Sequence, residues 1–356
     1  MSSMPHAAPD KPYLGPKMEP KEPLVLATPP GFALAPCVAL SPIGILPPLC
    51  YEPIQGVLQV ALPSSLGSVP SAGLPGFQPA VPNREVLLHS VPGEPALLMF
   101  GLAKGPLADA ALETVRWMLG LDEDLSLFHH LCTTDRELGW VAEQKAGRML
   151  RSATVFEDLV KVLITSQRPK QAHVICERLC QAFGPITMLS RPAFPEPQHL
   201  ASARPDELQD DLQLGSLGHQ IWQLAVLCAE GRPAPQTLKR QAPSLSAALC
   251  ADDEALFDDL VGEELAWQER LADLLLTLPG FGVRSVPKMM RLLGCYDLVE
   301  VHHHAVRAFA KQYPPRRKSK EPESNHDVME RLFQRLDGFG VYRSLAQSLL
   351  LLPRSA

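Results

Sequence analysis

The sequence predicts an α+β protein in which a small N-terminal lobe carrying an antiparallel sheet precedes a larger, all-helical body. Between residues 29 and 105, short apolar runs rich in β-favouring residues alternate with clusters of Gly, Pro and Ser. From Ala108 onward, apolar residues recur instead with the period of about 3.6 residues that is typical of helices. A chain of 356 residues also exceeds the size that one compact core usually reaches, so we expect at least two lobes.

Three consecutive segments make up the expected domain organisation. Residues 1–24 are rich in Pro, Lys and Ser without apolar periodicity, which predicts a disordered tail. We place the sheet-containing lobe at 25–107 and the helical body at 108–352. The predicted strands of the lobe are Val57–Leu62, Glu85–His89 and Ala96–Phe100. The predicted helices of the body are Ala110–Leu119, Leu125–Cys132, Val155–Ile164, Ala172–Phe183, Pro205–Leu212, His219–Ala229, Gln268–Leu278, Val283–Leu293 and an amphipathic stretch over Asp327–Leu352.

The net charge of −6 argues against a protein that coats nucleic acid through bulk charge, but the charges are unevenly distributed. Residues 251–270 carry eight acidic side chains and one arginine. Residues 284–320 carry nine basic side chains and two acidic ones. A local basic face on an acidic body is typical of a site-selective nucleic-acid binder.

Apolar stretches and cysteines narrow the class of protein further. No run approaches the roughly 18 to 20 apolar residues needed to cross a bilayer, and Met1–Pro23 lacks the apolar core of a signal peptide. We therefore expect a cytoplasmic, nucleoid-associated protein without membrane contact. The eight cysteines form no CxxC pair. Cys176 and Cys180 are spaced as on one face of a helix, which favours reduced core residues over metal ligands.

The most informative segment is a predicted pair of helices at 268–294. The first helix ends in the run Leu278-Pro279-Gly280-Phe281-Gly282, and the second helix follows at once. Two glycines around one apolar residue allow a tight turn whose amides, together with the next helix N-terminus, would form a seat for a DNA phosphate. Taken alone, the same run also fits an ordinary glycine helix stop before another helix.

The residues that follow this hairpin carry a resemblance to a known family. The hairpin, a short extended piece and the site segment 295–311 resemble the helix-hairpin-helix and Gly/Pro-rich loop plus Asp (HhH-GPD) signature. This is the signature of the endonuclease III and 3-methyladenine DNA glycosylase superfamily. Val301, His304 and Arg307 stand where the signature has Val, His and Arg, and His302 stands where it has the catalytic aspartate.

The resemblance extends from about Phe32 to Leu352. Phe156–Gln167 is similar to the helix of the 3-methyladenine glycosylase branch that ends in the residue filling the gap left by a flipped base, a position held here by Gln167. Leu214–His219 resembles the family's loop before another phosphate-facing helix. The resemblance implies a helix-hairpin-helix glycosylase body that binds double-stranded DNA with a damaged or modified base, flips this base out and hydrolyses its N-glycosidic bond.

The largest departure from the family is His302 itself. Cleavage of an N-glycosidic bond builds positive charge on the sugar, which a carboxylate stabilises and a neutral imidazole does not. Either His302 acts as a base for water, or a nearby carboxylate replaces the missing one. Asp297 and Glu300 are the candidates because they lie close to His302 in the sequence. Glu300 is the better one, because side chains two residues apart in an extended segment point to the same side. The predicted catalytic residues are therefore His302 and Glu300.

Further departures concern the hairpin and the cofactors. The lysine that forms a Schiff base in bifunctional members, two residues after Gly282, is replaced by Arg284, which stays protonated and predicts an enzyme without lyase activity. Lys288, one turn later, remains the alternative amine. We expect Pro287 to shift the second helix. No cysteine follows Cys295, so we expect no iron–sulfur cluster and no other cofactor.

The remaining predicted site residues are assigned to nucleic-acid contacts. Those expected to bind DNA are Gly280, Phe281, Gly282, Arg284, Gln167, His304, Arg307 and Lys311. Tyr296 is expected to stack on the flipped base. The consecutive histidines 302–304 point in different directions, which argues against a metal site. The basic run at 316–320 fits either a solvated loop or a phosphate contact.

Three functions stay open at the level of sequence. The first is a monofunctional DNA glycosylase that acts as a monomer on a damaged or modified base. The second is a catalytically inactive protein that kept the scaffold and binds DNA structure. The third is a protein-interaction module that uses the acidic face at 251–270. Base release from modified duplexes separates the first from the second, and DNA affinity at low salt separates both from the third.

Overall fold

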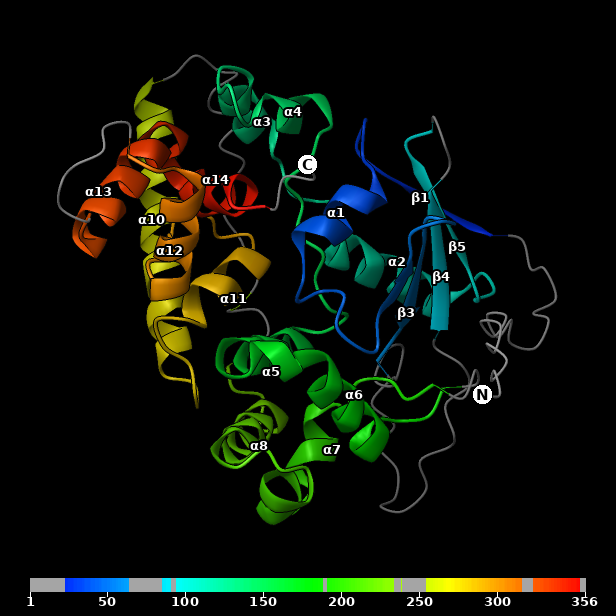
Figure 1. Cartoon of the computed structure of the whole chain (residues 1–356). Helices are drawn as coiled ribbons and strands as arrows, with labels where there is room; N and C mark the ends of the chain where they lie inside the picture. Colours follow the sequence, from blue (N-terminus) through cyan, green and yellow to red (C-terminus); the bar gives the residue numbers. More distant parts are fainter. Residues whose placement is uncertain are drawn as a thin grey trace, which may run out of the picture.

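Figure 1 shows the computed structural model of the chain, in which a sheet-containing lobe lies beside a helical body. The structure describes residues 23–63, 85–90, 94–187, 191–233, 238, 254–315 and 323–352. The predicted tail at 1–24 therefore falls almost entirely outside the described residues, and the basic run at 316–320 falls outside them completely. The α+β fold class predicted from the sequence is confirmed.

The lobe is built on a five-stranded sheet within the described residues, in the order β1-β5-β4-β3-β2, with every neighbouring pair antiparallel. Its strands are β1 (Leu24–Ala27), β2 (Cys50–Glu52), β3 (Val57–Ala61), β4 (Glu85–Ser90) and β5 (Ala96–Phe100). The three predicted strands are among them. The register aligns Leu24, Met99, Leu88 and Leu58 in one buried row across four strands, because alternate side chains of a strand share a face.

Two helices cover the buried face of this sheet. They are α1 (Leu34–Leu40) and α2 (Pro106–Met118), and in Figure 1 both lie on the side that faces the helical body. Leu34 and Val38 of α1 and Val115 and Met118 of α2 share one apolar core with the sheet. Leu150, later in the chain, belongs to the same core, and its amide donates to Ser41 Oγ at 2.6 Å.

The body contains the other predicted helices with shifted ends, whereas the predicted helix Ala110–Leu119 is α2 and packs on the sheet. Its helices are α3 (Ser126–Thr133), α4 (Gly139–Glu143), α5 (Val155–Gln167), α6 (Ala172–Phe183), α7 (Pro197–Ala201), α8 (Ser216–Ala229), α10 (Glu254–Leu276), α11 (Val286–Leu292), α12 (His303–Gln312), α13 (Asn325–Leu336) and α14 (Arg343–Leu350). None of these described helices is long and apolar enough to cross a membrane.

Two predicted helical stretches differ from the structure only in detail. Pro205–Leu212 is helical over residues 205–211, with a π-helical turn at Glu207–Asp211, where the backbone of Leu208 packs so closely on Gly218 that no side chain fits between them. The helical stretch Asp327–Leu352 is divided into two helices, because the chain turns at Gly340 with a φ of +49°.

Helix α5 is the central element of the body. Every side chain from Phe156 to Ile164 is buried, and the helix packs against α6, α8 and α11. Thr154 caps its N-terminus by accepting from the Glu157 amide at 3.2 Å. Buried Lys161 pairs with Glu157 at 2.7 Å and donates to the Leu46 carbonyl at 2.9 Å, which ties α5 to the N-terminal lobe. The end of α5 is therefore held in a fixed position relative to the lobe and the hairpin.

Candidate active site and nucleic-acid interface

The hairpin turn between α10 and α11 packs directly on the end of α5. Gly280 has a φ of +78°, and a Cβ added there would meet Gln220 Oε1 at 2.6 Å and Leu163 at 3.1 Å. Any other residue would therefore be strained at this φ and would have to displace the Gln220 side chain. Gln167, the last residue of α5, donates to the same Gln220 oxygen at 2.6 Å. We call the surface formed by Gln167, Gln220 and the turn 278–284 the hairpin edge.

Two of the amides predicted to bind phosphate are engaged inside the turn. The Phe281 amide donates to the Leu278 carbonyl at 3.1 Å, and the Gly282 amide donates to Ser285 Oγ at 2.8 Å. Neither amide is therefore free in this structure to bind a phosphate, and the Gly282 amide is bonded to Ser285, which directly precedes α11. A phosphate would reach this amide only after the Ser285 hydroxyl rotates away.

The outer part of the turn consists of Val283 and Arg284, which are exposed. The sequence places the second helix from Val283, but α11 begins at Val286. The shift follows from Pro287, which is tolerated only in the first turn of a helix. Arg284, predicted to bind DNA, consequently lies in the turn.

His302 holds the start of α12 and contacts a carboxylate. It is the N-terminal cap of the helix, and its Nδ1 accepts from the Ala305 amide at 3.3 Å. Since Nδ1 accepts, the proton of a neutral ring lies on Nε2, which is 2.7 Å from Glu300 Oε2 and donates to it. Both ring nitrogens are therefore in use. His302 has no lone pair left to take a proton from water unless the cap breaks.

Glu300 is the carboxylate that contacts His302, as expected for side chains two residues apart in an extended segment. Its other oxygen is paired with the Arg291 guanidinium, and its backbone is held on both sides by Gln347, at 2.8 and 2.7 Å. Burial alone would raise the pKa of the Glu300 carboxyl, but Arg291 and His302 hold it at about 2. The carboxylate is thus ionised at every physiological pH. Asp297, the other candidate, pairs instead with Arg343 at 2.6 Å.

Glu300 lines a pocket of about 430 Å³ between the N-terminal lobe and the helical body. The loop after α1, the end of α5, α11 and the end of α14 contribute to its wall. Its polar side chains include Lys288, Arg291, Glu300 and Gln347. Thr165 and Pro169, which flank Gln167 in the sequence, also line it. The pocket therefore lies at the same end of α5 as the hairpin edge.

Lys288 reaches this pocket from α11. Its Nζ lies 3.4 Å from Ser166 Oγ and 3.5 Å from the Thr165 carbonyl, both on α5. Burial lowers the pKa of the Lys288 ammonium, and the charge of Glu300 acts in the opposite direction. The sequence singled out Lys288 only as an alternative amine. Gln347 and the loop after α1 carry no sequence signal, because they join the site through tertiary contacts alone.

Helix α12 presents three of the predicted DNA contacts on one exposed face. His304, Arg307 and Lys311 are all exposed, and their spacing of three and four residues puts them on one side of the helix. The His304 ring lies 6.1 Å from the His302 ring. The basic face therefore begins next to the candidate catalytic pair.

The structure gives no support to base stacking by Tyr296. Its side chain is buried, stacks on Tyr342 at 6.2 Å and donates to Glu123 Oε2 at 2.6 Å. Glu123 is also paired with Arg151, which donates to the Leu292 carbonyl at the end of α11. Tyr296 thus fastens the site segment to the core, and a flipped base has no access to its ring.

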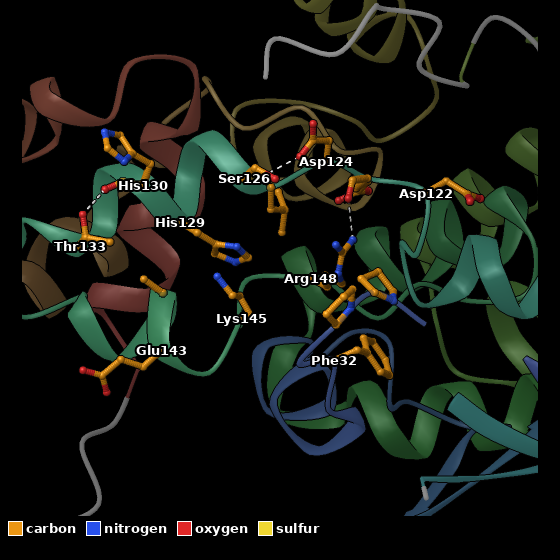
Figure 2. A pocket seen from close by; sticks show the side chains of 15 residues that line it. Phe32, Asp122, Asp124, Ser126, His129, His130, Thr133, Glu143, Lys145 and Arg148 are labelled. Carbon is orange, nitrogen blue, oxygen red and sulfur yellow. Dashed lines mark hydrogen bonds between the residues drawn. The ribbon is translucent and has the colours of Figure 1, made fainter. Parts of the chain in front are cut away.

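A second, larger pocket of about 820 Å³ lies between the lobe and α3, and none of the predicted site residues lines it. Figure 2 shows its lining, which includes Phe32, His129, Lys145 and Arg148. The His129 ring bonds the Ala146 carbonyl at 2.8 Å, and Arg148 donates to the carbonyls of Gly120 and Glu123. These polar groups therefore hold the backbone of the loops on either side of α3 and are already engaged inside the protein.

The fold defined by the lobe, the body and the hairpin is that of DNA glycosylases. Neither the family models nor the curated proteins compared with this sequence give a match. Among solved structures, 3-methyladenine DNA-glycosylase from Archaeoglobus fulgidus superposes with a TM-score of 0.61 at 16% identity, over 92% of this chain and 97% of that one. The apo form of Clostridium acetobutylicum 8-oxoguanine glycosylase/lyase superposes with a TM-score of 0.61 at 12% identity, over 94% of this chain and 98% of that one. MBOgg1 in complex with a low-affinity DNA ligand superposes with a TM-score of 0.60 at 16% identity, over 94% of this chain and 96% of that one.

Proposed function

We propose that the protein is a monofunctional DNA glycosylase that acts as a monomer on duplex DNA, flips out a damaged or modified base and hydrolyses its N-glycosidic bond. The observation that carries this proposal is the Glu300 carboxylate, which lines the pocket between the lobes and contacts His302 at 2.7 Å. The fold shared with DNA glycosylases, including one with 3-methyladenine and one with 8-oxoguanine in its name, supports the same class of substrate.

The proposed DNA contacts surround this pocket. Gln167 on the hairpin edge is exposed and would fill the stack after the base leaves it. Arg284 on one side and His304, Arg307 and Lys311 on the other would contact phosphates. Gly280, Phe281 and Gly282 form the turn itself, and the Gly282 amide becomes a phosphate donor when Ser285 releases it.

The proposed chemistry is electrostatic. As the bond to the base breaks, positive charge develops on the sugar, and the ionised Glu300 stabilises this charge. His302 donates to Glu300 and caps α12, so it positions the carboxylate. The low pKa makes Glu300 a weak base, so little proton abstraction by Glu300 assists the attacking water. The base leaves with the electrons of the broken bond, water adds to the sugar, and the proton that the water loses passes through solvent to the departing base.

Base release from a panel of modified duplexes tests this proposal. We expect Glu300→Gln to lower the single-turnover rate by about 10²- to 10³-fold, since it removes the charge and keeps the shape. Asp297→Asn, whose carboxylate pairs with Arg343 outside the pocket, is the matched control and should keep the rate. Equal rates for wild type and Glu300→Gln would contradict the assigned role.

A catalytically inactive DNA-structure binder is the second candidate. It is favoured by the ion pair between Glu300 and Arg291, which offsets part of the charge needed at the sugar. This candidate expects duplex binding without base release by the wild-type chain and a gain of base release in His302→Asp. Release by the wild-type chain eliminates it.

A further inference from the structure

The charged and amide acceptors of the pocket that contains Glu300 are engaged inside the protein. Both Glu300 oxygens are paired with Arg291 and His302, and both ends of the Gln347 amide are bonded to the Glu300 backbone. Ser41 Oγ accepts from the Leu150 amide. The hydroxyls of Thr165 and Ser348 donate to helix carbonyls, so they can meet a ligand only as acceptors.

The donors are less well satisfied. Lys288 Nζ has two long hydrogen bonds, of 3.4 and 3.5 Å, which a better acceptor would replace. Arg291 Nε has no hydrogen-bond partner within the described part of the chain, but this atom is itself buried and is not offered to a ligand. A ligand acceptor that enters the pocket would therefore be met by the Lys288 ammonium.

The charge of the pocket favours the same kind of ligand. Two cationic side chains, Lys288 and Arg291, line it together with one anionic side chain, Glu300. None of the described lining residues is aromatic, so the pocket offers no ring face to a cationic guest. The remaining wall is mostly apolar, with Ile43, Leu46 and Met149 among its residues. An uncharged base with an exocyclic carbonyl fits this lining, whereas a cationic alkylated base faces the Lys288 ammonium.

We propose that Lys288 is a specificity-determining residue that selects an uncharged, carbonyl-bearing base and rejects a cationic alkylated one. This inference rests on the proposed function, since it takes the pocket as the receptor of the flipped base. Lys288 Nζ would donate to the carbonyl oxygen, exchanging its long bonds to Ser166 and Thr165 for a shorter one. Selectivity then follows from attraction of the acceptor and repulsion of the positive charge.

Three duplexes that differ at one base test this inference. They carry hypoxanthine, 7-methylhypoxanthine, which adds a methyl group and, at about pH 5.5 where its N1 keeps the proton, a net positive charge, or purine, which lacks the carbonyl oxygen. As 2′-fluoro nucleosides they resist hydrolysis, so Kd is measured independently of base release. We expect the wild-type chain to bind the hypoxanthine duplex about tenfold more tightly than either of the other two.

Variants at position 288 assign the selectivity. Lys288→Met keeps the length and removes the charge, and we expect it to bring both Kd ratios close to one. Lys288→Gln serves as a second uncharged variant if the methionine protein does not fold. Lys288→Arg keeps the charge and should keep the preference against 7-methylhypoxanthine. Lys104→Met, at an exposed position in the N-terminal lobe, should leave both ratios unchanged.

The outcomes for the inference and for the proposed function are distinguishable. Tighter binding of the 7-methylhypoxanthine duplex by the wild-type chain, or Kd ratios unaltered in Lys288→Met, overturns the inference whether or not bases are released. Selective binding without any base release from the unfluorinated duplexes supports the inference and contradicts the glycosylase proposal.

Discussion

At the residue scale, both ring nitrogens of His302 already make hydrogen bonds. One nitrogen caps α12 and the other donates to Glu300, so the only anionic group at this point is the carboxylate two residues earlier. The contact between the two side chains could be predicted from their parity in an extended segment. The ion pair of Glu300 with Arg291 and the hydrogen bond of its backbone to Gln347 could not be predicted, because they depend on how α11 and α14 pack.

The Glu300 network makes a prediction about acid stability. The pKa of Glu300 is about 2 in the folded chain and near 4.5 when the chain unfolds, so its ionisation stabilises the fold above pH 4.5. This contribution is lost as the pH falls from about 4.5 to about 2. We expect Glu300→Gln to lower the free energy of unfolding at pH 7 by about 2 to 3 kcal/mol.

Urea denaturation at several pH values measures this effect. The difference between wild type and Glu300→Gln should shrink as the pH falls below 4.5. Asp297→Asn removes a more exposed ion pair with Arg343, so it should lower the free energy of unfolding by no more than about 1 kcal/mol. A Glu300→Gln difference that stays constant from pH 7 to pH 2 would speak against the lowered pKa.

At the element scale, the hairpin is where sequence patterns were most informative. The Gly-Phe-Gly run predicted a tight turn, and the structure explains Gly280 by its contact with Gln220. The position of Pro287 predicted the displaced start of α11. The engagement of the Gly282 amide by Ser285 was not predictable, since local hydrogen bonding by a serine depends on the exact turn geometry.

Substitution of Gly280 tests how the hairpin edge is held. Alanine there adds a Cβ at 2.6 Å from Gln220 Oε1 at a φ of +78°, so we expect a loss of about 1 to 3 kcal/mol of stability. The same substitution should also weaken DNA binding, because the displaced Gln220 side chain would lose its hydrogen bond to Gln167 on the hairpin edge. Gly262→Ala in α10, where a Cβ meets nothing within 4 Å, should instead raise stability by up to about 1 kcal/mol. Thermal unfolding of the two variants checks the contrast, and equal shifts would refute it.

The exposed face of α12 leads to a prediction about salt dependence. If Arg307 and Lys311 contact phosphates, alanine at either position should reduce the slope of log K against log salt by about 0.9. Fluorescence anisotropy with one duplex at several salt concentrations measures this slope. Lys104→Ala in the N-terminal lobe is the control and should leave it unchanged. A slope that is unaltered in both α12 variants would remove this face from the DNA interface.

At the scale of the whole molecule, the change from short β-favouring runs to helical periodicity was enough to predict the fold class. The pocket between the lobes was not predictable. Its wall joins residues more than 300 positions apart, from the loop after α1 to the end of α14, and no local pattern marks such a meeting. The sequence could therefore predict the segment that we propose carries the chemistry, whereas the pocket that we propose receives the base follows only from the packing of both lobes.

A structure of the protein bound to a duplex with a positively charged abasic-site analogue tests the central claim most directly. The ring nitrogen of such an analogue imitates the charge that develops on the sugar. We expect the Glu300 carboxylate to be the nearest anionic group, within about 4 Å of this nitrogen. Should the nitrogen lie closer to another carboxylate, or the analogue stay outside the pocket with Glu300 still facing only Arg291 and His302, the assigned site would be wrong.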